Sequence, residues 1–131
     1  MSRAVLQPPG WLRPLGYANG IAAAGRTIFT AGLIGWDEAG HFADGLTAQC
    51  TQVFANILAV LEEGGARPEH IVRLTWYITS RDAYLAEARA IGAAYRAAFG
   101  KQYPAMAVVQ VSALMERQAL VEIEATAVVP G

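Results

Sequence analysis

Two segments of the chain place apolar residues at steps of three and four positions, which is the spacing of one helix face. The first predicts a helix that is capped by Thr47 and ends near Glu63, before the stop signal Gly64-Gly65. Its apolar stripe consists of Leu46, Cys50, Val53, Phe54, Ile57, Leu58 and Leu61. The second predicts a helix that is capped by Ser80 and ends near Phe99.

Alternating apolar and polar residues predict β-strands in the second half of the chain. The clearest strand covers 71–79, and two more are expected at 105–112 and 120–129, separated by a turn around 116–118.

The first third of the chain is predicted to hold an extended arm followed by a hairpin. Proline and glycine dominate 7–16, which is typical of an arm with turns. The hairpin would pair strand 18–24 with strand 27–34 through a turn at Gly25-Arg26. Gly32, inside the second strand, indicates a bulge or a close approach of the backbone to another group.

The predicted order ββαβαββ describes an α+β fold with two helices on one face of a mixed sheet. The chain has 131 residues, which is the size of a single domain over 1–131, and 54% of them are hydrophobic. The other sheet face has no cover within the chain. We therefore expect subunits to close around that face.

Charge and composition disfavour several classes of function. The net charge is −1, so there is no basic excess for binding a nucleic-acid backbone. One cysteine and two histidines cannot form a closed zinc site, so we expect no metal. No segment approaches the roughly 20 apolar residues of a membrane span, and prolines interrupt any signal-like run near the start. We expect a cytoplasmic protein without membrane contact.

The last predicted strand carries the strongest candidate for acid–base chemistry. Glu122 and Glu124 point to the face opposite the apolar residues of the strand, with their side chains roughly 7 Å apart. Either that face is an ordinary solvated surface, or one carboxylate lies in a cleft, where it orients a water or accepts a proton. Cys50 is expected to be a buried, inert thiol. His41 and His70 have no partners that would form a catalytic triad.

Several motifs follow one another in a recognisable order. They are Tyr17 after the arm, Thr30-Ala31-Gly32, Gln49 and Asn56, Gly64-Gly65-Ala66, Ile71-Val72-Arg73-Leu74-Thr75, Tyr103-Pro104-Ala105 and Val121-Glu122-Ile123-Glu124-Ala125. Together they resemble the RidA/YjgF family, once called L-PSP endoribonuclease, and the similarity runs nearly end to end.

The resemblance implies a chorismate-mutase-like fold and a homotrimer with a barrel-like centre and three clefts between neighbouring subunits. The best-known members hydrolyse 2-imino or 2-enamino acids to 2-oxo acids and ammonia, with no metal or organic cofactor. In those members the arginine of a Pro-Ala-Arg motif holds the substrate carboxylate, a role that suits a forked guanidinium. The ribonuclease label fits this chain poorly, because neither its charge nor a His/Lys constellation supports it.

This chain departs from the family pattern at the arginine, because it reads Pro104-Ala105-Met106. A thioether cannot pair with a carboxylate. Three other cleft positions differ as well: Ala31 stands for a serine, Gly92 for an asparagine and Val108 for a cysteine.

The acid and the phenol implied by the resemblance, Glu122 and Tyr17, are retained, and Gly32 is also present. We therefore expect a more apolar substrate pocket, lined also by Trp36 or Trp76. Little deamination of the family's usual imino acids is expected.

Two kinds of function follow. In an enzyme, Glu122 positions water for attack on an imine, an enamine or a related electrophile, and backbone amides near Ala107 and Val108 bind the developing charge. Its substrate is then less anionic, or its carboxylate meets another arginine, for which the candidates are Arg13, Arg89 and Arg96. Alternatively, a non-catalytic trimer holds a small ligand in its clefts. An unpaired Glu122 in a cleft favours the enzyme, and a Glu122 sealed in an ion pair favours the binder.

Overall fold

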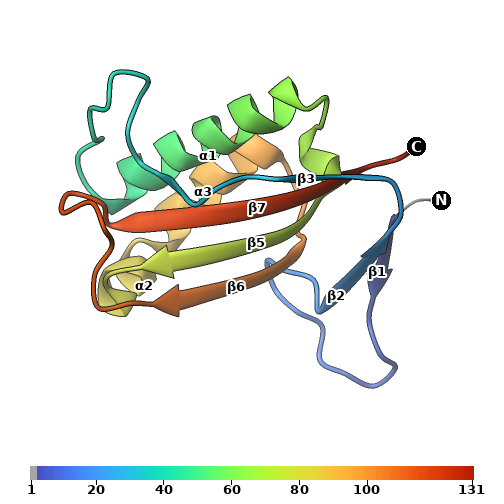
Figure 1. Ribbon diagram of the computed structural model, residues 1–131. Helices are drawn as coiled ribbons and strands as arrows, with labels where there is room; N and C mark the ends of the chain where they lie inside the picture. Colours follow the sequence, from blue (N-terminus) through green and yellow to red (C-terminus); the bar gives the residue numbers. More distant parts are fainter. Residues whose placement is uncertain (1–2) are drawn as a thin grey trace.

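A computed structural model describes residues 3–131, so Met1 and Ser2 of the predicted domain lie outside the described residues (Figure 1). Strand β7 (Val121–Val129) is central, because it pairs antiparallel with β5 (Ile71–Ile78) on one side and with β3 (Arg26–Phe29) and β4 (Leu33–Ile34) on the other. β6 (Ala105–Gln110) lies parallel to β5 at the edge. The sheet is therefore mixed, as predicted.

Three helices cover one face of this sheet, and within residues 3–131 the opposite face stays open (Figure 1). The helical elements are α1 (Leu46–Glu63), the 3-10 turn η1 (Pro68–His70), α2 (Arg81–Ala86) and α3 (Ala88–Phe99). The core between the layers is centred on Phe54, whose ring meets those of Trp76, Tyr95 and Phe99 edge-on. This confirms the α+β fold. The described residues form no closed barrel.

The predicted N-terminal hairpin is wrong. β2 (Gly20–Ala23) pairs with a strand that the sequence reading missed, β1 (Arg3–Leu6), whereas β3 pairs with β7. The chain changes sheets at Gly25, where a Cβ would overlap the carbonyl of Val129 and φ is +148°. The sequence does not indicate β1, because a strand of four residues shortly before a proline pair shows too little alternation of apolar and polar residues. The β-branched run of β3 fits the free side of β7, which lies about a hundred residues away.

The strand predicted over 27–34 is interrupted between β3 and β4. At the interruption Thr30 bonds Ala125 twice, because its N–H donates to the Ala125 carbonyl and its hydroxyl accepts from the Ala125 N–H, both at 2.9 Å. Thr30 therefore keeps the chain attached to β7 while the regular ladder is broken. Gly32 lies in the same break, which agrees with the irregularity predicted there.

Both predicted helices need a correction at one point. The N-cap of α1 is Gly45 rather than Thr47, and Thr47 instead donates its N–H and its hydroxyl to the Glu87 carboxylate. The second helix breaks at Glu87 into α2 and α3, so the carboxylate at the break holds the start of α1. The cap predicted at Ser80 is confirmed, since its hydroxyl accepts from the Ala83 N–H.

Cys50 is fully buried on the inner face of α1, as predicted. Burial raises the pKa of its thiol to about 12, so the thiolate is not available at neutral pH. No helix within residues 3–131 combines the length and the apolar character needed to cross a membrane.

Gln49 is a buried polar side chain that joins α1 to two loops. Its amide nitrogen donates to the carbonyls of Gln118, at 2.9 Å, and Ala43, at 3.3 Å. Its oxygen accepts from the Leu120 N–H at 2.8 Å. The side chain therefore fixes the loop that leads into β7, and with it the start of the strand that carries Glu122.

We predict that Gln49→Leu lowers the free energy of unfolding by about 3 kcal/mol, because it leaves buried backbone groups without partners. Urea denaturation followed by circular dichroism measures the change. Gln52→Leu on the same helix is the matched control, since the Gln52 amide bonds only the Asn56 side chain. Equal losses in the two variants would contradict this role of Gln49.

Candidate functional site

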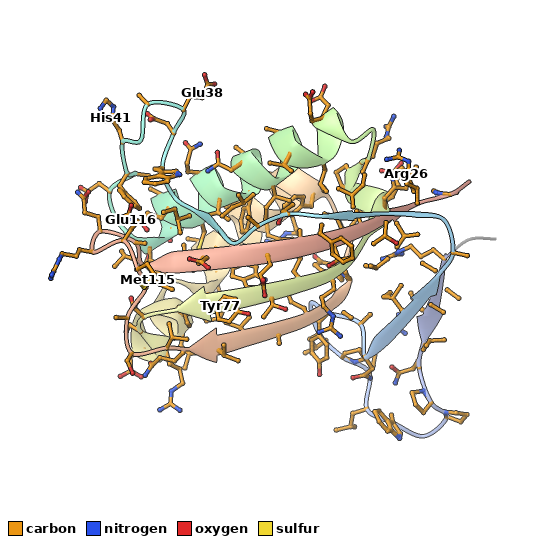
Figure 2. The ribbon with its side chains drawn as sticks, viewed as in Figure 1. Arg26, Glu38, His41, Tyr77, Met115 and Glu116 are labelled. Carbon is orange, nitrogen blue, oxygen red and sulfur yellow. The ribbon has the colours of Figure 1, made fainter. Side chains whose placement is uncertain are left out.

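The open sheet face carries the two carboxylates that the sequence analysis singled out. Val121 and Ile123 of β7 are buried under the helices, so Glu122 and Glu124 project to the other side. In the register, Tyr77 of β5 lies opposite Glu122. Figure 2 shows the Tyr77 side chain at β5. Its hydroxyl, however, donates to Glu124 Oε1 at 2.6 Å, and this hydrogen bond raises the pKa of Tyr77. Glu124 is therefore tied to a neighbour.

Glu122 differs from Glu124 because it has no hydrogen-bond or ion-pair partner within residues 3–131. The side chain is half-buried and lies against Gly32, where a Cβ would overlap the carboxylate. The close approach predicted at Gly32 is thus confirmed, and the approaching group is Glu122. A half-buried carboxylate without a partner keeps its acceptor oxygens available for water or a ligand.

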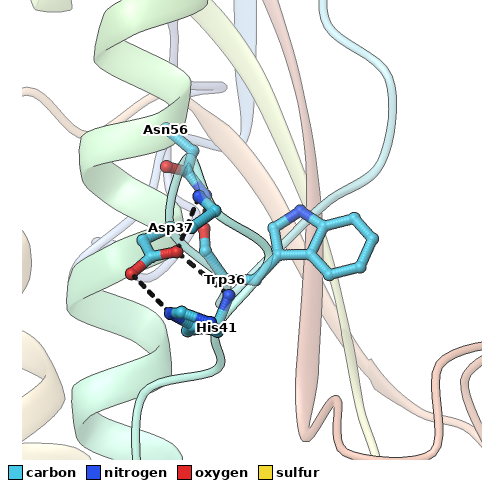
Figure 3. A network of polar contacts seen from close by, with 5 residues as sticks. Trp36, Asp37, His41 and Asn56 are labelled. Atoms are coloured by element: carbon cyan, nitrogen blue, oxygen red, sulfur yellow. Dashed lines mark hydrogen bonds and ion pairs between the residues drawn. The ribbon is translucent and has the colours of Figure 1, made fainter.

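Glu122 lines a shallow cavity of about 370 Å³ together with Gly32, Trp36 and Asn56. Asn56 of α1 donates its amide to the carbonyls of Ile34 and Trp36, both at 2.9 Å, which fixes the chain after β4 against the helix (Figure 3). Trp36 remains 38% exposed. The Glu122 carboxylate therefore shares a hollow with an exposed aromatic ring and a firmly held backbone.

The loop beyond Trp36 is organised by Asp37, which with Glu38 also lines the hollow at Glu122. The Asp37 carboxylate accepts hydrogen bonds from the backbone N–H groups of His41 and Ala39 (Figure 3). These bonds lower the pKa of Asp37, and the bond from His41 has the larger effect. The His41 ring is exposed, 3.9 Å from Asp37. The other histidine, His70, accepts the Arg67 N–H through Nδ1 and so caps η1. Both histidines thus have local structural contacts.

Met106 and Val108 face the helices, on the side of β6 opposite to that of the two glutamates. They pair with Leu74 and Trp76, whose side chains are buried in the core. A cavity of about 200 Å³ lies beside them and is lined by Met106, Gly92 and a group of aromatic rings. Tyr17 joins Met106 and Val108 in an adjoining hollow of about 270 Å³.

The predicted site residues therefore fall into two groups on one chain. The hollow of about 370 Å³ is lined by Gly32, Trp36 and Glu122. The two adjoining hollows beside β6 are lined by Tyr17, Gly92, Met106 and Val108. None of these hollows contains members of both groups.

The remaining two predicted site residues, Ala31 and Ala107, are exposed outside these hollows. Ala31 follows β3, and its carbonyl accepts the Thr30 hydroxyl at 2.7 Å. Ala107 lies opposite Thr75 on the open face.

Two polar contacts of the site were not assigned from the residues alone. The sequence pattern places Tyr77 in an alternating strand and says nothing of its partner. Asn56 enters only through the resemblance to the RidA/YjgF family. An amide inside an otherwise apolar helix is a signal that could have indicated a backbone contact for Asn56. The pairing of Tyr77 with Glu124 depends on the register between β5 and β7. Within residues 3–131, no three histidine, cysteine or carboxylate side chains are grouped to hold a metal ion.

The chain is similar to proteins of one family throughout its length. The family model described as endoribonuclease L-PSP matches residues 13–129. A RutC family protein of Pyrococcus abyssi is 34% identical over 117 residues, covering 88% of each chain. Among solved structures, the Rid-family protein YyfB from Yersinia pestis is 35% identical, with a TM-score of 0.83 over 98% of this chain and 100% of that one.

A second solved structure, RidA from the Antarctic bacterium Psychrobacter sp., is 29% identical, with a TM-score of 0.70 over 96% of this chain and 99% of that one. These similarities agree with the order of motifs along the chain and with the helix-covered mixed sheet. The chain therefore belongs to the RidA/YjgF family.

Proposed function

We propose that the chain forms a homotrimer whose clefts between neighbouring protomers bind a small molecule and hydrolyse an imine or enamine in it. Two observations support the assembly. The open sheet face has no cover within residues 3–131, and the predicted site residues other than Ala31 and Ala107 lie in hollows that a single chain does not join. In the proposed trimer, the hollow at Glu122 of one protomer meets the hollow at Met106 of the next.

The observation that carries the proposed chemistry is the unpaired carboxylate of Glu122. It accepts a proton from water while the water oxygen adds to the imine carbon, and it then gives this proton to the imine nitrogen, which leaves Glu122 ionised again. The resulting carbinolamine passes its hydroxyl proton to nitrogen by way of Glu122, the carbon–nitrogen bond breaks, and ammonia leaves behind a carbonyl compound. Every atom in this sequence comes from the imine and one water.

The developing charge is stabilised by the backbone N–H of Val108, which points to the outer edge of β6, because N–H directions alternate along a strand and the Val111 N–H donates to Ile78 of β5. β6 is an edge strand, so part of its backbone lies outside the hydrogen-bonded ladder. The outer edge is covered by Ala18 only at the start of the strand, next to Ala105. Edge N–H groups that already point at the reacting atoms stabilise charge without reorganisation.

Glu122→Gln is expected to reduce imine hydrolysis by about a hundredfold, because an amide cannot accept the proton from water. The assay generates imines in situ with an amino-acid oxidase and follows ammonia release above the spontaneous rate. Glu124→Gln is the matched control on the same strand and face, and its activity is expected to stay within about twofold. A fully active Glu122→Gln variant would contradict the role of Glu122, whereas no ammonia release above the spontaneous rate by the unmodified protein would favour the non-catalytic binder.

Imines related to 2-aminoacrylate are expected to be poor substrates, because Met106 offers their carboxylate no ionic contact. Met106→Arg is expected to raise ammonia release from them by about tenfold if one charge-assisted contact is restored. Fast turnover of these small imines by the unmodified protein contradicts the expectation. If a folded Met106→Arg variant shows no gain, then the changes at Ala31, Gly92 and Val108 limit the activity as much as the missing arginine does.

The assembly is tested separately by light scattering coupled to gel filtration. The expected mass is three times the 13.9 kDa of one chain. A stable monomer at micromolar protein concentration would rule out clefts between protomers, whatever the activity measurements show.

A further inference from the structure

The structure separates the three arginines that could replace the missing cation. Arg96 of α3 lines the same cavity as Met106 and Gly92. Arg13 lies in the arm and lines a neighbouring hollow with Tyr17. Arg89 lines none of the hollows described above. Only Arg96 therefore shares a cavity with the residue that stands at the family's arginine position.

Gly92 leaves room for the Arg96 guanidinium. The two residues are four positions apart, so they are neighbours on one face of α3. A Cβ at position 92 would lie 3.3 Å from Arg96 Nη1, which places the guanidinium directly over the glycine. A larger side chain there would take the space that the guanidinium now uses. The absence of a side chain at position 92 is therefore what leaves space for the Arg96 guanidinium.

The Arg96 guanidinium has no ion-pair or hydrogen-bond partner within residues 3–131. It lies on an exposed part of α3 at the cavity, so its forked donors can meet a carboxylate from solvent. No carboxylate of the described chain neutralises it.

Four aromatic rings line the cavity, together with the aliphatic residues Leu15, Ala88 and Ile91. Trp76 and Tyr84 meet edge to face at 6.0 Å, and Tyr95 stacks on Tyr103 at 5.7 Å. The cavity volume is about 200 Å³. A cavity on the order of 150 Å³ is enough for one benzene ring. The lining and the size therefore suit a single aromatic or branched apolar group.

Trp76 brings a buried donor close to the wall of this cavity. Its side chain is 2% exposed, and its indole N–H has no hydrogen-bond partner within residues 3–131. Leaving such a donor unpaired costs free energy, so buried polar groups normally have a partner. Trp76 lines the cavity, although its indole nitrogen is itself fully buried, so a ligand that contacts the ring changes the surroundings of this N–H without bonding to it.

We propose that Arg96 binds the carboxylate of the ligand in place of the missing arginine, and that the aromatic cavity beside it selects 2-imino acids, and their 2-oxo acid products, that carry an aromatic side chain. The reaction of such a ligand rests on the proposed function, but its recognition by Arg96 does not. A 2-imino acid with a methyl or ethyl side chain leaves the cavity unfilled. The same cavity therefore accounts for the expected preference for aromatic side chains and for the position of the Arg96 guanidinium.

Calorimetric titration with phenylpyruvate tests the recognition directly. We expect phenylpyruvate to bind at least about tenfold more tightly than pyruvate, because only its ring fills the cavity. Arg96→Gln should weaken phenylpyruvate by at least about tenfold while changing binding of the neutral benzyl methyl ketone by less than about twofold. The indole N–H resonance of Trp76, identified by its loss in Trp76→Phe, should shift when phenylpyruvate binds.

Arg89→Gln is the matched control, since it removes the same charge from the same exposed helix. It should leave phenylpyruvate affinity within about twofold of the unmodified protein. The proposal is overturned by unchanged affinity in Arg96→Gln, by an equal loss in Arg89→Gln, by a loss in Arg13→Gln alone, or by failure of phenylpyruvate to bind.

These outcomes differ from those that test the proposed function. Hydrolysis that depends on Glu122, with no effect of Arg96→Gln on ligand affinity, removes the assignment of Arg96 and leaves the proposed function standing. Conversely, phenylpyruvate that binds through Arg96 without any imine hydrolysis supports the recognition and contradicts the enzyme.

Discussion

The alternation of side chains along β7 determines both the core and the candidate site. Val121, Ile123 and Ala125 are buried under the helices, and a strand repeats every two residues. Burying this row therefore forces Glu122 and Glu124 onto the uncovered face. A slip of one residue would put both carboxylates into the apolar core, so the register that stabilises the fold also positions the acid.

The two carboxylates share a strand and a face but differ in their surroundings. Glu124 accepts a hydrogen bond from Tyr77, whereas Glu122 lies against a glycine that offers it no side chain. Met106 lies on the other side of the sheet, at the edge strand. A site that uses both Glu122 and Met106 thus needs atoms from two chains, and its chemistry is inseparable from the assembly.

The sequence predicted those elements whose pattern is local. The stripe of α1 and the alternation of β5 and β7 need only neighbouring residues, and these elements were predicted nearly to their ends. The pairing of β3 with β7 could not be read in this way, because Arg26 meets Val129 across most of the chain. The helix break at Glu87 was hidden for a similar reason: the apolar stripe continues through it, and the bonds from Thr47 come from another helix.

The candidate site was predictable to a comparable extent. The final strand indicated Glu122, and the resemblance to the family indicated Met106 and Tyr17. The sequence offered Arg13, Arg89 and Arg96 as equal candidates, because nothing in the spacing of these residues tells which of them reaches the cavity. Only the cavity that Arg96 shares with Met106 distinguishes them.

The central place of β7 also affects how the protein forms during synthesis. The three strands that pair with β7 all precede it along the chain. Until 121–129 have been made, β3 and β4 therefore have no partner in this sheet, and β5 has only β6. The helices can form earlier, because their hydrogen bonds are local. Closing contacts over such a separation is slow, and until then the edges of β3 and β5 are open to other chains. Chaperone binding to a partly folded chain is therefore most useful before β7 joins the sheet.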